Sequence, residues 1–227
     1  MKSLVSGAAV FPASVVNCER SRTICITGHR RSKIIPYRSN PMLTYSAVRL
    51  MLYRYIDMAV EAGYENFISG LASGTDLWSA EYIVMKKRRN SNIKLIAVMP
   101  FLKHAEYLNS ADLAVLAEVE RNADFLVTVS DNPDMVYRNY VSANCSPDVY
   151  RDRNYYMVDN SSAVIAFADN QKLRSGTHQT MRYAYRNGRK IYSFNMDNIY
   201  AVIEKCGSDI RAIGNEIALI ENVFNAR

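Results

Sequence analysis

The chain has 227 residues, of which 49% are hydrophobic and 22% charged, and its formal net charge is +6. This length suits one domain better than two and allows a full core, which excludes a small fold that depends on disulfides or metal ions. The modest positive charge favours anionic partners and fits nucleotides and nucleic acids equally.

The four cysteines are scattered and show no C-x-x-C spacing, so we expect neither a disulfide framework nor a zinc site, and a reducing, cytoplasmic compartment. No apolar run approaches the length of a membrane span, so we expect no membrane contact. The first residues, 1–22, contain a mildly apolar stretch that serine, glycine and proline interrupt. We interpret them as a flexible extension rather than an export signal, followed by one domain over residues 23–227 that ends in a helix.

Short β-rich runs then alternate with amphipathic segments along the chain. The runs are too brief for helices and predict six strands, at Thr23–Thr27, Asn66–Ser69, Lys94–Met99, Phe125–Val129, Ala163–Phe167 and Lys190–Phe194. The segments between them and at the end have helical spacing, at Leu43–Ala62, Leu77–Arg89, Ser110–Asn122, Tyr150–Asp159, Thr177–Arg186 and Ser208–Phe224.

Strands that alternate with helices predict an α/β fold, a Rossmann-like three-layer α/β/α domain with a mainly parallel sheet of about six strands. Ligands of such sheets bind at the carboxyl ends of the strands, near the point where strand order reverses. The loops that follow the strands are therefore where we look for function.

The first strand ends in Thr27-Gly28-His29-Arg30. Gly28 permits a tight turn and close approach of a ligand to the backbone, and His29 and Arg30 then place donors at the sheet edge. A simple strand exit with exposed polar residues explains the same pattern.

The second predicted strand runs into a glycine-rich turn, Ser69-Gly70-Leu71-Ala72-Ser73-Gly74-Thr75-Asp76, that opens a helix. Small residues at such a junction expose backbone N–H groups beside a positive helix terminus, which makes Gly70, Ser73 and Gly74 candidate anion-binding residues. The turn has neither the Walker lysine nor the G-x-G-x-x-G spacing. Asp76 either complements the helix dipole, accepts hydrogen bonds from a ribose, or orients His29 or Arg30.

A second candidate anion turn lies in Asp169–His178, where Ser175-Gly176-Thr177 opens the next helix. Before it, Arg151 and Arg153 begin a predicted helix, where they oppose the helix dipole. A bound anion would explain arginines at that end; solvated surface side chains are the alternative.

These motifs together resemble the YpsA-like branch of the SLOG superfamily, whose relatives include the DprA and LOG proteins. The matching residues are T-G-H-R at Thr27–Arg30, S-G-L-A-S-G-T-D-L-W at Ser69–Trp78, R-N-Y-Y-M-V-D at Arg153–Asp159 and S-G-T at Ser175–Thr177. The resemblance implies a Rossmann-like sheet that binds a nucleotide or a nucleotide derivative at its glycine turns. Carried over residue by residue, it implies ligand-binding roles for Gly28, His29, Arg30, Gly70, Gly74, Asp76, Arg153, Asn154, Gly176 and Thr177; we add Ser73 and Ser175 from their turns.

Two positions depart from the superfamily pattern. Ser175 stands where the phosphate turn usually has a first glycine, and Thr180 stands where LOG enzymes have the glutamate that they use to cleave an N-glycosidic bond. Without that carboxylate, help for a leaving group has to come from elsewhere. The resemblance therefore implies a binding protein more than a LOG-type hydrolase.

Three functions follow, in order of preference. The first is a sensor that binds a phosphorylated nucleotide derivative of the ADP-ribose or NAD type and requires no cofactor, no metal ion and no known catalytic residue. The second is a nucleoside-phosphate N-glycosidase that uses Asp76 or Asp159. The third is binding of single-stranded DNA, for which 16 tyrosines and the positive charge provide stacking and phosphate contacts. We also expect a homodimer, through the tail helix and the tyrosine-rich segment Tyr137–Tyr156.

Overall fold

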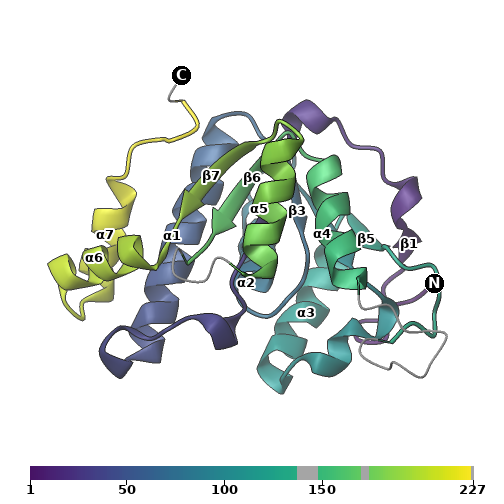
Figure 1. The fold of residues 1–227 in the computed structure, drawn as a ribbon, viewed down its shortest axis with the longest axis horizontal. Helices are drawn as coiled ribbons and strands as arrows, with labels where there is room; N and C mark the ends of the chain where they lie inside the picture. Colours follow the sequence, from purple (N-terminus) through teal and green to yellow (C-terminus); the bar gives the residue numbers. More distant parts are fainter. Residues whose placement is uncertain (137–147, 170–173, 226–227) are drawn as a thin grey trace.

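A sheet of seven parallel strands forms the centre of the computed structural model, which describes residues 1–136, 148–169 and 174–225 (Figure 1). In space the strands follow the order β1-β5-β4-β3-β2-β6-β7, and every neighbouring pair is parallel. Their bounds are β1 Phe11–Pro12, β2 Thr23–Gly28, β3 Asn66–Ser69, β4 Lys94–Met99, β5 Phe125–Thr128, β6 Ala163–Phe167 and β7 Lys190–Phe194.

Helices cover both faces of this sheet and make the three layers that the sequence predicts. One layer contains α1, α2, α3, α6 and α7, while α4 and α5 pack against each other on the opposite face (Figure 1). Their bounds are α1 Pro41–Glu61, α2 Thr75–Lys87, α3 Ser110–Asn122, α4 Val149–Asp159, α5 Gly176–Arg186, α6 Met196–Cys206 and α7 Ile210–Ala218. The α/β, Rossmann-like fold class is confirmed.

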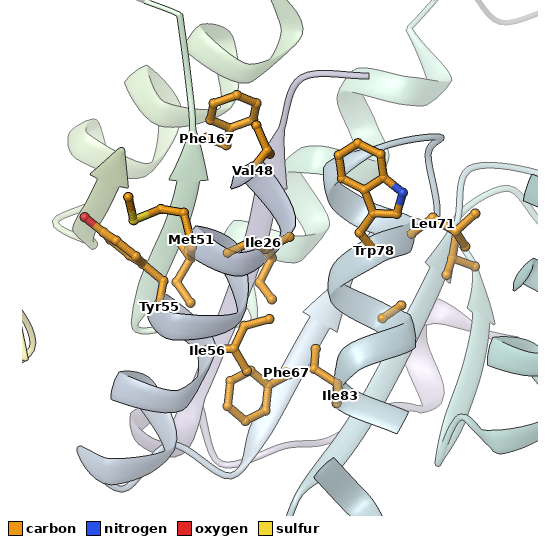
Figure 2. Close-up of a cluster of buried hydrophobic side chains, with 14 of the residues drawn as sticks. Ile26, Val48, Met51, Tyr55, Ile56, Phe67, Leu71, Trp78, Ile83 and Phe167 are labelled. Atoms are coloured by element: carbon orange, nitrogen blue, oxygen red, sulfur yellow. The ribbon is translucent and has the colours of Figure 1, made fainter. Parts of the chain in front are cut away.

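The buried strands supply alternate side chains to the two layers of core. In β2, Ile24 and Ile26 face the larger core and Cys25 faces the smaller one, as the two-residue repeat of a strand requires. Figure 2 shows the larger core, where Ile26 and Phe67 from the sheet meet Ile56 of α1. Burial on both faces explains why these strands have continuous apolar runs in the sequence.

Two elements were absent from the prediction. Helix α6 begins with a capping box, in which the Asn195 and Asn198 side chains each accept from the other's backbone N–H, and it buries Ile199 and Ile203. Strand β1 is the seventh strand and has only two residues, too few for a periodic signal.

The first 22 residues, expected to be a flexible extension, contact the domain at several points. The N-terminal amine of Met1 donates to the carbonyl of Val10 at 3.0 Å, and β1 pairs with β5 at the sheet edge. The Ser3 hydroxyl donates to the buried Glu120 carboxylate of α3, and Tyr156 of α4 donates to the carbonyl of Ala13. The extension therefore lies along the β5 edge of the sheet.

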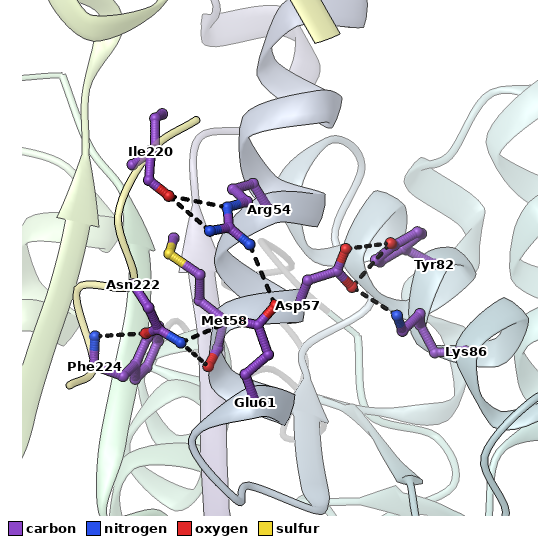
Figure 3. Close-up of polar contacts among 9 residues, drawn as sticks. All are labelled: Arg54, Asp57, Met58, Glu61, Tyr82, Lys86, Ile220, Asn222 and Phe224. Atoms are coloured by element: carbon purple, nitrogen blue, oxygen red, sulfur yellow. Dashed lines mark hydrogen bonds and ion pairs between the residues drawn. The ribbon is translucent and has the colours of Figure 1, made fainter. Parts of the chain in front are cut away.

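The tail after α7 is fixed to α1 by polar contacts (Figure 3). Arg54 donates two hydrogen bonds to the Ile220 carbonyl, at 3.2 and 2.7 Å, and the Asn222 amide donates to the carbonyl of Met58 and to Glu61. Helix α7 ends at Ala218, earlier than the apolar spacing predicts, and the Ile220 carbonyl beyond it accepts from Arg54 of α1 instead of from a continuing helix.

Strand order reverses at β2. The chain moves from β2 through β3, β4 and β5 in one direction, and then returns to place β6 on the other side of β2. The loops after β2 and β6 therefore separate at this point, which is where open α/β sheets bind ligands. No helix among residues 1–136, 148–169 and 174–225 is long and apolar enough to cross a membrane.

Candidate functional site

A cavity of about 250 Å³ opens at the carboxyl ends of β2, β3 and β4. The loops after these strands provide most of its wall, and the starts of α3 and α4 complete it. The lining residues are Arg30, Ser32, Gly70, Leu71, Ala72, Ser73, Pro100, His104, Leu108, Asn109, Asp112 and Tyr150. Of the predicted site residues, Arg30, Gly70 and Ser73 line this cavity.

The glycines next to the cavity are required by packing. A Cβ on Gly28 would lie 2.6 Å from the Thr75 side chain, so this glycine lets the end of β2 approach the start of α2. Gly74 has φ +93°, and a Cβ there would lie 2.5 Å from the backbone nitrogen of Arg31. A side chain at either position would push the two loops apart.

Asp76 and Arg153 form a buried ion pair behind the glycine turn. Arg153 Nη1 lies 3.4 Å from Asp76 Oδ2 and also donates to the carbonyl of Gly70. Both side chains are more than nine-tenths buried. Burial raises the pKa of the Asp76 carboxyl, and the charge of Arg153, a hydrogen bond from Ala72 and the charge of Arg30 oppose that rise. Burial likewise lowers the pKa of Arg153.

The contacts of this pair bear on the alternatives for Asp76 and Arg153. The Asp76 carboxylate accepts from the Ala72 backbone, and the Thr75 N–H donates to the His29 carbonyl at 3.3 Å. The backbone N–H groups of Ala72 and Thr75 therefore have partners within the protein. The negative charge near the start of α2 is that of Asp76 itself. Arg153 is a buried partner of that charge rather than a solvated surface arginine.

His29 connects the two sides of the switch point. Its ring is buried, and its Nε2 accepts a hydrogen bond from the backbone N–H of Asp169 at 2.7 Å. The ring also packs edge-on against Phe167, the last residue of β6. Through this hydrogen bond His29 joins the loop after β2 to the chain that leaves β6.

Arg30 is the exposed cation of the cavity. Its guanidinium lies 5.3 Å from the centre of the Tyr150 ring at the start of α4. A guanidinium held over an aromatic ring keeps its outer N–H groups available for an anion. Arg30 therefore puts an exposed positive charge at the carboxyl edge of the sheet.

The cavity wall also has an acidic residue. Asp112 of α3 is 5% exposed, and its Oδ2 accepts from the Ser73 hydroxyl at 2.6 Å and from the Asn109 amide at 2.9 Å. The turn after β3 is thereby joined to the start of α3, a role for Ser73 that the sequence did not indicate.

His104 is a cavity residue that sequence reasoning missed. It follows β4 in a short 3-10 helix, Leu102–Tyr107, is 6% exposed, and its Nε2 is buried with no hydrogen-bond partner among the described residues. Burial and the charge of Arg153 lower its pKa from 6.5 to about 3, so the ring is uncharged at neutral pH. Its position after the carboxyl end of a buried strand was the signal that could have found it.

The second predicted anion turn lies outside this cavity. Ser175 caps α5 by accepting from the His178 N–H at 3.2 Å, Gly176 is exposed and a Cβ added there would meet no atom within 4 Å, and Thr177 is buried. Asn154 is half-buried on α4 and does not line the cavity. Residues 170–173 of this loop, and residues 137–147 of the tyrosine-rich segment, lie outside the described residues.

The carboxylates predicted for a hydrolase are engaged elsewhere. Asp76 is in the ion pair with Arg153, while Asp159 accepts from the Tyr183 hydroxyl at 2.9 Å. Asp159 ends α4 shortly before β6 begins, which puts it at the amino ends of the strands, away from the cavity. In the described part of the chain, no group of three or more His, Cys, Asp or Glu side chains could hold a metal ion.

The family model described as the YspA SLOG family (YpsA) matches residues 24–199, which run from the second residue of β2 to beyond β7. The chain belongs to the YpsA family of SLOG proteins. This membership fits a nucleotide-related function. Relatives include a UPF0398 protein of Macrococcus caseolyticus, 24% identical over 66% of this chain and 75% of the relative. Another is the SPbeta prophage-derived protein YoqJ of Bacillus subtilis, 30% identical over 58% of this chain and 77% of YoqJ.

Among solved structures, DNA processing protein A (DprA) from Streptococcus pneumoniae is similar, with 17% sequence identity and a TM-score of 0.46. The match covers 86% of this chain and 61% of DprA, so the chain spans less than two thirds of that protein.

Proposed function

We propose that this YpsA-family protein binds a phosphorylated nucleotide derivative, of the ADP-ribose or NAD type, in the cavity at the carboxyl ends of β2, β3 and β4. The observation that carries the proposal is the cavity beside the switch point, with the exposed guanidinium of Arg30 at its wall. The start of α5, where Gly176 leaves open space, is a second position for a phosphate on the other side of β2.

Neither carboxylate that the sequence offered for catalysis lines the cavity. Cleavage of an N-glycosidic bond needs a carboxyl group that reaches the leaving group or the sugar. Asp76 is buried in an ion pair, and Asp159 lies at the other edge of the sheet. These positions argue against cleavage by Asp76 or Asp159, and the carboxylate that does line the cavity, Asp112, accepts hydrogen bonds from Ser73 and Asn109. We therefore favour a sensor that holds the nucleotide derivative.

The cavity volume limits the part of the ligand that it holds. At about 250 Å³ it is smaller than the roughly 300–1,000 Å³ of typical small-molecule sites. A mononucleotide-sized part suits it, so the remainder of a dinucleotide would extend along the edge towards α5.

The test is a thermal-shift series with AMP, ADP-ribose, NAD, inorganic phosphate and a single-stranded oligonucleotide. A ligand at 100 times its Kd adds about 2.7 kcal/mol of stability, which raises the Tm by several degrees. We expect ADP-ribose or NAD to raise the Tm of the wild type, and Arg30→Gln to reduce that rise. Arg88→Gln is the matched control, because Arg88 is an exposed arginine at the far end of α2.

Mass spectrometry of the supernatant after denaturation provides an independent measurement, since a co-purified nucleotide would be released. If no nucleotide raises the Tm and none is released, the proposal is wrong. A Tm rise with the oligonucleotide alone would favour single-stranded DNA instead, and a salt series would then measure its phosphate contacts.

A further inference from the structure

The cavity lining contains side chains of opposite charge, and their positions bear on how a ligand would lie in it. Arg30 supplies the exposed positive charge, next to the Tyr150 ring. Asp112 supplies a negative charge that is 5% exposed, and the Ser73 and Asn109 side chains both donate to the same oxygen of it. A phosphate is attracted to Arg30 and repelled by Asp112.

The acidic wall has capacity for further donors. An ionised carboxylate accepts about four hydrogen bonds, and the two side-chain donors to Asp112 both use Oδ2. Hydroxyl groups are donors without charge, so a sugar satisfies a carboxylate that a phosphate cannot approach. Carboxylates recognise ribose hydroxyls in this way in other nucleotide-binding sheets.

A second observation on the same cavity points to a polar, uncharged group. His104 is 6% exposed and lines the cavity, and its Nε2 has no hydrogen-bond partner among the described residues. A buried polar atom without a partner is costly, and such atoms often mark a place that a ligand or water completes. The charged groups at the cavity are Arg30 and Asp112 in its lining and Arg153, which lies against Gly70.

We infer that the ligand lies in one orientation, with a phosphate at Arg30 and an uncharged, hydroxyl-bearing part such as a ribose against Asp112 and His104. This inference rests on the proposed function and specifies the chemistry that the cavity selects. Asp112 and His104 are then specificity-determining residues, which distinguish a ribose-containing ligand from one without hydroxyl groups.

The experiment compares two probes, AMP and 2′,3′-dideoxyadenosine 5′-monophosphate, by isothermal titration calorimetry. The wild type is expected to bind AMP about 10-fold to 100-fold more tightly, because the dideoxy probe leaves a charged acceptor without its donors. Asp112→Asn is expected to weaken AMP to the level of the dideoxy probe and to leave the latter unchanged. Arg30→Gln is expected to weaken both probes by the same factor.

Two further variants separate recognition from folding. His104→Phe keeps a ring of similar size and removes the unpaired nitrogen, so it is expected to fold at least as well as the wild type and to bind AMP about 10-fold more weakly. Glu118→Gln is the control for Asp112→Asn, since Glu118 is an exposed carboxylate near the other end of α3. It is expected to change neither Kd.

Each outcome of the titrations tests the proposed orientation of the ligand. If the wild type binds both probes equally and Asp112→Asn changes neither Kd, the orientation is wrong while phosphate binding stands. If Asp112→Asn tightens both probes, the phosphate lies at the acidic wall and the inference is reversed. If the wild type binds neither probe, nucleotide binding in this cavity fails and the inference fails with it.

Discussion

Two strand-to-helix turns of this protein look alike in composition and differ in their contacts. The turn after β3 is buried: Gly70 lies against Arg153, and Asp76 provides an anion from within the protein. The turn that opens α5 is exposed at Gly176, where a Cβ would meet no atom within 4 Å. Small residues at a helix start therefore serve close packing in one case and leave open space in the other. The pattern of small residues alone does not distinguish a packed turn from an open one.

The largest loss of stability is expected when the buried Asp76 carboxylate loses Arg153, its partner. Arg153→Met leaves the buried Asp76 carboxylate unpaired, and such a change costs about 3–5 kcal/mol. Urea denaturation measures it, and the double variant with Asp76→Asn should recover much of the loss because no charge is then buried. Equal stability of Arg153→Met and the wild type would mean that the pair does not hold the turn.

A pair of glycine substitutions compares the turns directly. Gly70→Ala places a Cβ on the Arg153 guanidinium and is expected to cost about 3 kcal/mol, as overpacking at a buried site does. Gly176→Ala meets no atom and is expected to change stability by less than about 0.5 kcal/mol. Similar losses for both, in the same denaturation experiment, would contradict the contrast between them.

The buried ring of His104 predicts a pH dependence. Its folded pKa is about 3 and its unfolded value is 6.5, so the unfolded state binds more protons between these values. The free energy of unfolding is therefore unaffected by His104 protonation above pH 6.5, and it decreases as the pH falls from 6.5 towards 3. Within this window the wild type should lose up to about 1.4 kcal/mol per pH unit more than His104→Phe. Parallel stability curves for the two proteins would contradict a neutral buried His104.

A smaller loss than that of Arg153→Met or Gly70→Ala is expected from the helix cap at the open turn. Ser175→Ala removes the side chain that caps α5 and is expected to cost about 1 kcal/mol. Ser175→Asp keeps an acceptor at the cap and should restore most of this. A Tm below the wild type for Ala and near it for Asp is the expected pattern; no change in either would mean that the cap adds little.

The sequence was sufficient for most of the sheet, and three of the candidate residues, Arg30, Gly70 and Ser73, line the cavity. The six predicted strands are all present because continuous apolar runs between helical segments are typical of buried parallel strands. Strand β1 was not predictable, since two residues have no period. The glycine turn was identified, but its pairing of Asp76 with Arg153 was not, because 77 residues separate them. His104 follows a strand without any repeated pattern, so only the fold brings it to the cavity.

The strand order also has a consequence in time. Strand β2 lies between β3 and β6, and Ile24 pairs with Ala163, which a ribosome adds 139 residues later. Phe11 of β1 likewise pairs with Val127 of β5, which is synthesised much later. During synthesis the first strands therefore leave the ribosome before their partners exist, and the early chain has an unpaired edge until β5 and β6 arrive.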